Sequence, residues 1–362
     1  MKITRIRTIP LRRRLERPIG NATATISAFS YLAIYLDTDE GLSGENLIFT
    51  IRPEQLKLLD AMVHVLEGAI IGRDPDDTEG FWAEASKRIN FIGFSGVSIM
   101  GISALDGAMW DLRGRRHGLS IARLIGRRRE RVPTYASGGL WLTQSIPELV
   151  SEAEGFVAAG FTAMKLRLAG DAGIDIPRLA ALRTAVGPGI ALMVDANQAM
   201  SVKGAIALAR QMEAYEIAWF EEPVPAHDLE ASAEVRRALS MPLASGENDY
   251  TRFGFRRLIE TGAADILMPD LQRVGGPSEF LKVAALAGTH GLPISSHLFP
   301  EQSLQLLGAI DGVHSLEHVD WYAPLYREGL DMRDGAVIVP DRPGWGFSFD
   351  PDALAHYALA ES

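Results

Sequence analysis

Short apolar runs recur in the middle of the chain, and each ends in a residue that can bind a metal or move a proton. The first three runs end in Asp195, Glu221 and Glu247, which follow one another at intervals of 26 residues. One strand and one helix fill such an interval in a parallel barrel, where chemistry sits at the carboxyl ends of the strands. Two further runs end in Asp270 and His297. We therefore look for function at the ends of these runs.

The same alternation of strand and helix patterns surrounds these runs and ends at Glu317. Capping signals mark helix starts: Ser145 precedes Glu148 by three residues, the spacing of a capping box, and Asp175 is expected to cap the second helix. After Glu317 no helical period follows, and Pro and Gly residues mark turns. The pattern predicts an α/β fold, a modified TIM barrel of the (β/α)7β type over residues 130–324.

Residues 1–125 do not show this alternation of strand and helix patterns. We predict that they form a smaller α+β lobe. Alternating residues over 30–36 and 42–48 flank a cluster of turn residues and predict a β-hairpin. The segment 18–26 has no strong period, so we expect a loop there, and in a two-lobed enzyme such a loop is a candidate lid. Residues 325–362 are expected to return to this lobe and complete it.

Composition narrows the class of protein. The 362 residues are 47% hydrophobic and 23% charged, as in a globular protein with a large core. The net charge is −10, so we do not expect the protein to bind nucleic acid. The absence of cysteine excludes disulfides and thiol catalysis, and neither a signal-type segment nor a run of membrane-span length is present. We expect a cytoplasmic protein that binds no membrane.

The three carboxylates at adjacent strand ends indicate a metal site. Packed together without a counterion, Asp195, Glu221 and Glu247 would place like charges in contact. An all-oxygen set suits a hard cation, so Mg²⁺ is the first expectation and Mn²⁺ the second. Glu222 should point the other way along its strand, and we do not expect it to be a ligand.

Strand-end positions also predict a general base. Asp270 and His297 end neighbouring strands, and a carboxylate that accepts from one imidazole nitrogen makes the other a better base. Strand two of the predicted barrel, residues 163–168, presents Lys165 and Arg167 on one face, where they are expected to stabilise a substrate carboxylate as it gains charge. Glu317 could donate a hydrogen bond to the same oxygen if its crowded surroundings keep it protonated.

Other polar and aromatic residues are expected to contact the substrate. Asn197 lies two residues after Asp195 and should face inward, while Asn21 and Trp141 are placed in segments that could shape specificity. A metal on a carboxylate, a cation beside it and a base at the adjacent carbon together describe α-proton abstraction from a carboxylic acid. The substrate is therefore expected to be a small carboxylate.

Ordered motifs along nearly the whole chain resemble the mandelate racemase branch of the enolase superfamily. The resemblance implies that the first lobe is a capping domain that selects the substrate, that the metal is Mg²⁺, and that the protein forms a homo-oligomer. The tail from Glu317 to Gly346 also resembles sugar-acid dehydratases of this branch, such as those acting on galactarate or talarate. The matching motifs are Ala104-Leu105-Asp106, Trp110-Asp111-Leu112, Lys165-x-Arg167, Val194-Asp195-Ala196-Asn197-Gln198, Phe220-Glu221-Glu222-Pro223, Gly246-Glu247, Pro269-Asp270, Gly275-Gly276 and Ser295-Ser296-His297.

One position departs from that branch. Mandelate racemases carry Lys-x-Lys on strand two and use the second Lys as a base, whereas this chain has Arg167, whose guanidinium stays protonated. We therefore favour a single base, His297, and dehydration of a sugar acid to a 2-keto-3-deoxy acid. The alternatives are a racemase, epimerase or cycloisomerase that uses the same enediolate, and a metal-binding barrel without catalysis.

Overall fold

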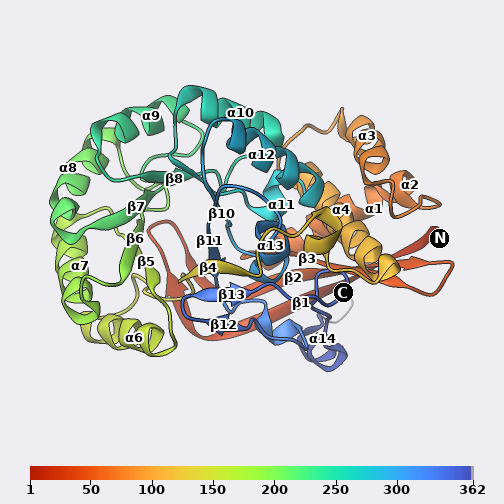
Figure 1. Cartoon of the computed structure of the whole chain (residues 1–362), viewed down its shortest axis with the longest axis horizontal. Helices are drawn as coiled ribbons and strands as arrows, with labels where there is room; N and C mark the ends of the chain where they lie inside the picture. The colour runs from red at the N-terminus through yellow and green to blue at the C-terminus, as the bar shows by residue number, and fades with distance from the viewer. Residues whose placement is uncertain (360–362) are drawn as a thin grey trace.

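The computed structural model describes residues 1–359, which form a barrel and a smaller lobe against its mouth (Figure 1). The sheet of the smaller lobe has three antiparallel strands in the order β1 (Ile3–Gly20), β2 (Thr25–Thr38) and β3 (Ser43–Thr50). The expected hairpin is present as β2 and β3, paired from Asp37 and Ser43 onward. The expected loop over residues 18–26 is wrong at both ends, because β1 runs to Gly20 and β2 begins at Thr25.

Helix α4 (Val97–His117) is the centre of the smaller lobe, and nearly all of its side chains are buried. Small residues let other elements approach it closely: a Cβ on Gly44 of β3 would collide with the backbone oxygen of Ala108. Within the helix, a Cβ on Gly107 would collide with the side chain of Asn46 and one on Gly101 with that of Met62, so close packing explains these small residues. The remaining helices of this lobe are η1 (Pro53–Gln55), α1 (Leu56–Val65), α2 (Glu67–Ile70), α3 (Thr78–Ile89) and α5 (Ile121–Ile125).

Eight parallel strands form a closed barrel, which confirms the predicted fold. The barrel closes where the last strand pairs with the first, Leu316 opposite Thr134. Its floor below the strand ends is filled by large side chains, among them Tyr135 and Trp219, whose rings meet edge to face at 5.0 Å. The strands are β4 (Arg131–Ala136), β5 (Ala163–Arg167), β6 (Ala191–Asp195), β7 (Ile217–Glu221), β8 (Leu243–Ser245), β9 (Ile266–Leu267), β10 (Ile294–Ser295) and β11 (Val313–His318).

Helices surround this barrel on the outside (Figure 1). The capping box of Ser145 and Glu148 is present. Asp175, however, is not the cap of the next helix: Asp171 caps it, and Asp175 accepts hydrogen bonds from the backbone of the preceding loop at Ala169, 2.8 Å. The helices are α6 (Ile146–Ala158), α7 (Ala172–Val186), α8 (Val202–Met212), η2 (Glu213–Tyr215), α9 (Leu229–Ala238), α10 (Thr251–Thr261), α11 (Leu271–Val274), α12 (Pro277–Thr289) and α13 (Pro300–Leu307).

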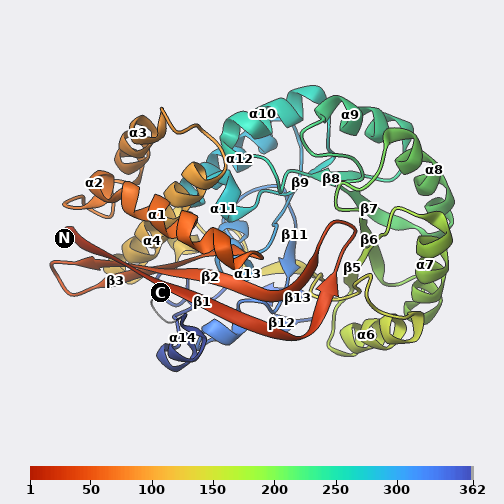
Figure 2. The same cartoon turned by 180° about the vertical axis from the view of Figure 1, so that it is seen from behind.

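The last part of the chain runs back along the outside of the barrel to the smaller lobe (Figure 2). Its elements are η3 (Ala323–Leu325), β12 (Met332–Arg333), β13 (Ala336–Ile338) and α14 (Pro351–Tyr357). β13 pairs antiparallel with β4, and Ala358 then bridges to Leu11 of β1. The domain boundaries at residues 125 and 325 stay a prediction. Within residues 1–359, no helix combines the length and the apolar character needed to cross a membrane.

Buried polar side chains of α4 join the two lobes. Asp106 accepts hydrogen bonds from the backbone N–H of Ser278, 2.9 Å, and from its hydroxyl, 2.7 Å, at the start of α12. Trp110 donates to the same hydroxyl at 3.0 Å. Asp111 accepts from the backbone N–H of Trp345 in the returning segment, 2.9 Å. The motif residues of the first lobe therefore act as structural joints that hold this lobe over the barrel mouth.

Candidate active site

The ends of the barrel strands bring most of the predicted site residues together. Arg167, Asp195 and Glu221 are aligned across β5, β6 and β7, and Glu247 follows β8 by two residues. All lie at the carboxyl ends of the strands, below the first lobe. The site is buried, since the side chain of Lys165 is only 1% exposed.

Lys165 is surrounded by carboxylates. Its Nζ lies 2.7 Å from Glu221 Oε1, 3.0 Å from Glu317 Oε1 and 3.6 Å from Asp195 Oδ2. Burial and the neighbouring Arg167 lower the pKa of Lys165, but these carboxylates outweigh them and raise the pKa above its ordinary value. The side chain is therefore held as an ammonium that can stabilise negative charge.

Arg167 is held by three neighbours. Its Nη1 donates to Asp195, its Nη2 donates to the hydroxyl of Ser137 at 3.1 Å, and its guanidinium carbon lies 4.9 Å from the ring centre of Trp141. Burial lowers the pKa of Arg167, but the carboxylates around it raise the pKa to a value above the ordinary one. Strand β5 thus presents two permanent cations.

Asp270 and His297 form a hydrogen-bonded pair. His297 Nδ1 lies 2.7 Å from Asp270 Oδ2, and its Nε2 lies 3.2 Å from Glu247 Oε2. Asp270 Oδ1 accepts from the backbone N–H of Arg273 at 2.8 Å, so the carboxylate is fixed at the start of α11. Burial lowers the pKa of His297, but Glu247 and Asp270 outweigh it and raise the pKa to about 9. With these two partners His297 is an imidazolium at neutral pH, and its Nδ1–H donates to Asp270 while Nε2–H faces Glu247. A cation bound to Glu247 would offset the charge that raises this pKa and would leave Nε2 free to accept a proton, with Nδ1–H still held by Asp270.

Glu317 is surrounded by hydrogen-bond donors that favour its charged form, and not the protonated form in which it could donate a hydrogen bond to the substrate. Its Oε1 accepts from the hydroxyl of Ser137 at 2.6 Å and from Lys165, and its Oε2 accepts from the backbone N–H of Leu298 at 2.6 Å. Burial raises the pKa of Glu317, but Lys165, His297 and Arg167 lower it further than burial raises it. Hydrogen bonds from three directions favour the charged form.

The three expected metal ligands each face a cation in this structure. Asp195 pairs with Arg167, Glu221 with Lys165, and Glu247 with His297. Among residues 1–359, no three His, Cys, Asp or Glu side chains surround a common point that could hold a metal ion. The chemistry of the set nevertheless suits a hard divalent cation: burial raises the pKa of Glu221 to about 8, Lys165 opposes this, and the repulsion of Asp195, Glu317 and Glu247 adds to it.

Glu222 is a further buried carboxylate beside the site, and the strand alternation used to point it away does not hold here. Its φ of 34° departs from an extended strand, so the alternation of side chains does not apply. The carboxylate accepts from Asn248 Nδ2 at 2.8 Å. Burial raises its pKa well above the ordinary value, and repulsion from Glu247 adds to this. In the sequence, only its position directly after Glu221 could have suggested that Glu222 lies beside the site.

The three residues that were expected to contact the substrate lie in different surroundings. Asn197 donates to Asp195 Oδ2 at 3.1 Å, and its own Oδ1 is buried without a hydrogen-bond partner, so it can accept one from a ligand hydroxyl. Trp141 packs against Arg167. Asn21 uses its side-chain oxygen to accept from the backbone of Ala24 at 2.8 Å and so closes the β1–β2 turn. A contact of Asn21 with substrate stays a prediction.

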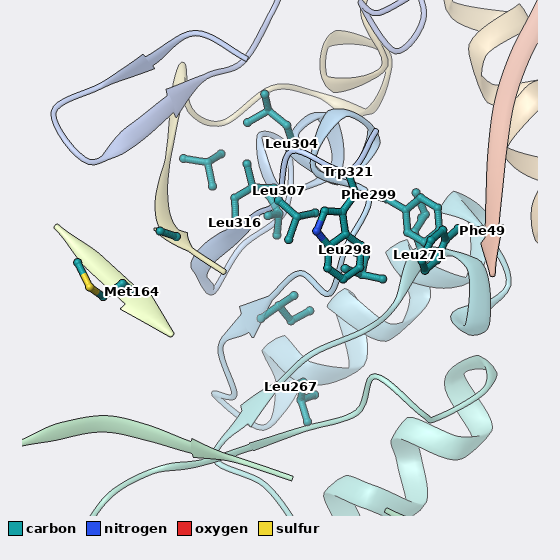
Figure 3. Packing of buried hydrophobic residues seen from close by; sticks show 14 of the residues in the cluster. Phe49, Met164, Leu267, Leu271, Leu298, Phe299, Leu304, Leu307, Leu316 and Trp321 are labelled. Carbon is teal, nitrogen blue, oxygen red and sulfur yellow. The ribbon is translucent and has the colours of Figure 1, made fainter. Parts of the chain in front are cut away.

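An aromatic cluster at the mouth was not predicted. Phe29 of β2 stacks on Trp321 at 4.6 Å, Trp321 stacks on Trp141 at 6.1 Å, and Phe49 of β3 lies 5.7 Å from Trp321. Figure 3 shows Trp321 beside Leu298, with Phe49 next to the barrel helix that carries Leu271. These residues come from distant parts of the chain, so no sequence pattern links them.

Comparisons with known proteins cover both lobes. Residues 3–126 match the family model described as "Mandelate racemase / muconate lactonizing enzyme, N-terminal domain", and residues 148–353 match "Enolase C-terminal domain-like". The chain is 34% identical to D-galactarolactone cycloisomerase of Agrobacterium fabrum over 100% of both chains. It is 37% identical to L-talarate/galactarate dehydratase of Salmonella typhimurium, over 78% of this chain and 72% of that one.

A solved structure extends the comparison to the fold. The L-talarate dehydratase of a Polaromonas species, complexed with Mg and L-glucarate, superposes with a TM-score of 0.93 and 32% sequence identity, over 100% of this chain and 98% of that chain. The likeness therefore includes both lobes and their relative placement.

Proposed function

Because the chain belongs to the mandelate racemase and muconate lactonizing enzyme family of the enolase superfamily, we propose that it removes the α-proton of a hydroxylated carboxylate with a single base. The enediolate then expels the oxygen on the β-carbon. The observation that carries this proposal is that, among the described strand-end side chains, His297 is an imidazole held by Asp270 on one side of the mouth, whereas the other side presents Arg167, whose guanidinium is a poor base.

Asp195, Glu221 and Glu247 are the proposed ligands of Mg²⁺, the ion found with relatives of the chain. When bound, the ion neutralises these carboxylates and stabilises negative charge on the substrate carboxylate and its enediolate. Lys165 donates a hydrogen bond to the same carboxylate from the strand β5 side. Asn197, with its free Oδ1, accepts from a substrate hydroxyl.

His297 carries the proton through both halves of the reaction. Its Nε2, with Nδ1–H held by Asp270, takes the proton from the α-carbon, and the electron pair of that C–H bond moves into the enediolate. The imidazolium then gives the proton to the hydroxyl on the β-carbon, which leaves as water. The resulting enol becomes a 2-keto-3-deoxy acid. Arg167 cannot accept a proton, so the opposite face of the α-carbon has no base and racemisation is disfavoured.

Cycloisomerisation is the second candidate, because a relative that matches the chain over its whole length is a cycloisomerase. The first step is the same, but the oxygen on the β-carbon belongs to a ring. Expulsion of that oxygen opens the ring, and no water is lost. The relatives that match the chain are enzymes, so we do not favour a metal-binding barrel without catalysis. A cytoplasmic location and a homo-oligomeric state, both expected from the sequence, stay predictions.

A screen with Mg²⁺ tests the proposal. Galactarate, talarate, galactonate and galactarolactone are incubated with the protein, and any 2-keto product is trapped with semicarbazide. A product from an open-chain acid indicates dehydration, and a product from the lactone alone indicates cycloisomerisation. The same acids in D₂O report on α-proton exchange. Exchange with retention of water and inversion at the α-carbon would refute the one-base mechanism.

A further inference from the structure

We propose that the substrate is a monocarboxylate whose far end carries no charge, and that this end binds in a cavity between the first lobe and the ends of β9 and β10. The inference rests on the proposed function, since it takes the reacting carboxylate to lie at Lys165 and the metal ligands. It adds the substrate class, which the family leaves open: relatives of the chain act on diacids such as galactarate and on monoacids such as galactonate.

The cavity has a volume of about 330 Å³, at the small end of the usual range for ligand sites. It lies beside the Asp270 and His297 pair, because its wall includes Leu298, the residue after His297, and Asp270, which binds Nδ1 of His297 at 2.7 Å. Its wall is mostly apolar. The first lobe contributes Phe49, Ile51, Leu59 and Met100, and the barrel contributes Leu298 and Phe299.

The other side of the mouth is filled. Trp141 follows β4, Trp321 follows β11, and their stacked rings lie between Phe29 and the guanidinium of Arg167. All three aromatic side chains are buried. A substrate that extended toward β4, β5 or β11 would have to displace this stack, whereas the cavity at β9 and β10 offers space. The part of the substrate beyond the reacting carbons is therefore directed into the cavity.

The cavity wall offers no net positive charge for a second carboxylate, because its two charged side chains are Asp270 and Arg273. Within residues 1–359, the one cationic side chain on its wall is Arg273, and its Nη1 donates to the backbone oxygen of Glu247 at 2.9 Å and lies 3.6 Å from the carboxylate of Glu247. Gln272 is committed to the backbone of Phe49 through both ends of its amide. A second carboxylate here would face the carboxylate of Asp270, and the cation near it, Arg273, is already paired with Glu247, whereas a methyl or hydroxymethyl group needs no counterion.

Calorimetric titration of the His297→Asn variant with Mg²⁺ tests the class without turnover. The ligands are galactonate, 6-deoxygalactonate and galactarate, which share the configuration of carbons 2 to 5. We expect both monoacids to bind at least about tenfold more tightly than the diacid. Equal or tighter binding of galactarate, or binding of none of the three, would overturn the inference.

A cation placed in the cavity should change the preference. Met100 is half-buried on the wall, and Met100→Lys has nearly the same length, so galactarate should gain about tenfold in affinity relative to galactonate. Met100→Gln, equally long and uncharged, is the matched control. Leu58 on the same wall is 62% exposed, so Leu58→Lys provides the same test at a position that tolerates charge. An affinity ratio identical in the Lys and Gln variants would refute the assignment of the cavity.

The two proposals can fail separately. Wild-type protein is incubated with the tightest ligand in D₂O, and α-proton exchange is followed. Selective binding of the monoacids without exchange or product would refute the proposed reaction and support the cavity assignment. Turnover of galactarate in preference to galactonate would support the proposed reaction and refute the cavity assignment.

Discussion

Replacing Gln272 by Leu should loosen the first lobe where it borders the proposed substrate cavity. β3 is an edge strand of its sheet, so the outer N–H and C=O of Phe49 have no strand partner. Gln272 takes that place: its Oε1 accepts from Phe49 N at 2.6 Å, and its Nε2 donates to Phe49 O at 3.2 Å. Both residues are buried, and Gln272 stands two positions after Asp270.

The expected cost follows from these two bonds. Leu has a similar size and no polar atoms, so the variant leaves one buried donor and one buried acceptor of Phe49 unpaired, at about 1–3 kcal/mol each. The adjacent cavity allows a water to reach them and recover part of this loss. We expect a net destabilisation of about 2–4 kcal/mol. Because Phe49 and Ile51 form part of the cavity wall, KM should rise about tenfold while kcat changes little.

The assay is urea unfolding of both proteins, together with steady-state kinetics on the substrate found in the screen. Gln302→Leu is the matched control, since Gln302 is equally buried but donates to the hydroxyl of Tyr326, away from the first lobe. We expect it to lower stability without a change in KM. An unchanged KM in Gln272→Leu, with the same loss of stability as the control, would refute the view that this pair positions the cavity wall.

Three other changes test the site and the core. His297→Asn should lower kcat by about 10²–10⁴-fold and leave the affinity for Mg²⁺, measured by calorimetry, largely intact; full activity would exclude His297 as the base. Arg167→Lys should allow a proton to be taken and returned at the second face of the α-carbon, so NMR in D₂O should detect inversion absent from the wild type, and no inversion would argue against a base position there. Burial raises the pKa of Glu301 to about 8, while the unfolded carboxyl titrates near about 4.3. The folded chain thus keeps a proton that the unfolded chain has lost, so this stabilisation is complete below about pH 4 and is lost as the pH rises to about 8, by at most about 1.4 kcal/mol per pH unit. Glu301→Gln should remove this slope in urea unfolding between pH 5.5 and 8.5, and parallel curves for the two proteins would contradict it.

The barrel and most of the candidate site were predictable because strand ends repeat a simple rule. In a parallel barrel, a residue that follows a buried strand lies at the mouth. The positions of Asp195, Glu221 and Glu247 can therefore be predicted from the local sequence alone. β1 was missed for the opposite reason. Its residues 12–14 are three arginines, and only pairing with β2, Arg12 opposite Ser30, makes this stretch a strand.

Local backbone geometry limited the prediction within the site. The side-chain alternation that was applied to Glu222 assumes an extended backbone, and its φ of 34° removes that assumption. Asp175 stands at a plausible capping position, but Asp171 begins the helix and leaves Asp175 to bind the loop. Such choices depend on one or two backbone angles, which residue identity alone does not determine.

The ionisation of Glu317 shows why the charge state of a buried residue needs the structure. Crowding by other carboxylates alone would favour a proton on Glu317, and only with that proton could it donate a hydrogen bond to the substrate. Lys165 at 3.0 Å and the Leu298 N–H at 2.6 Å reverse the result. With Glu317 ionised, Lys165 must stay protonated, and Arg167 is held in the same way by Asp195. A site in which β5 supplies two cations leaves His297, held by Asp270, as the imidazole that the described strand ends offer for proton transfer, which is the physical basis for chemistry with one base.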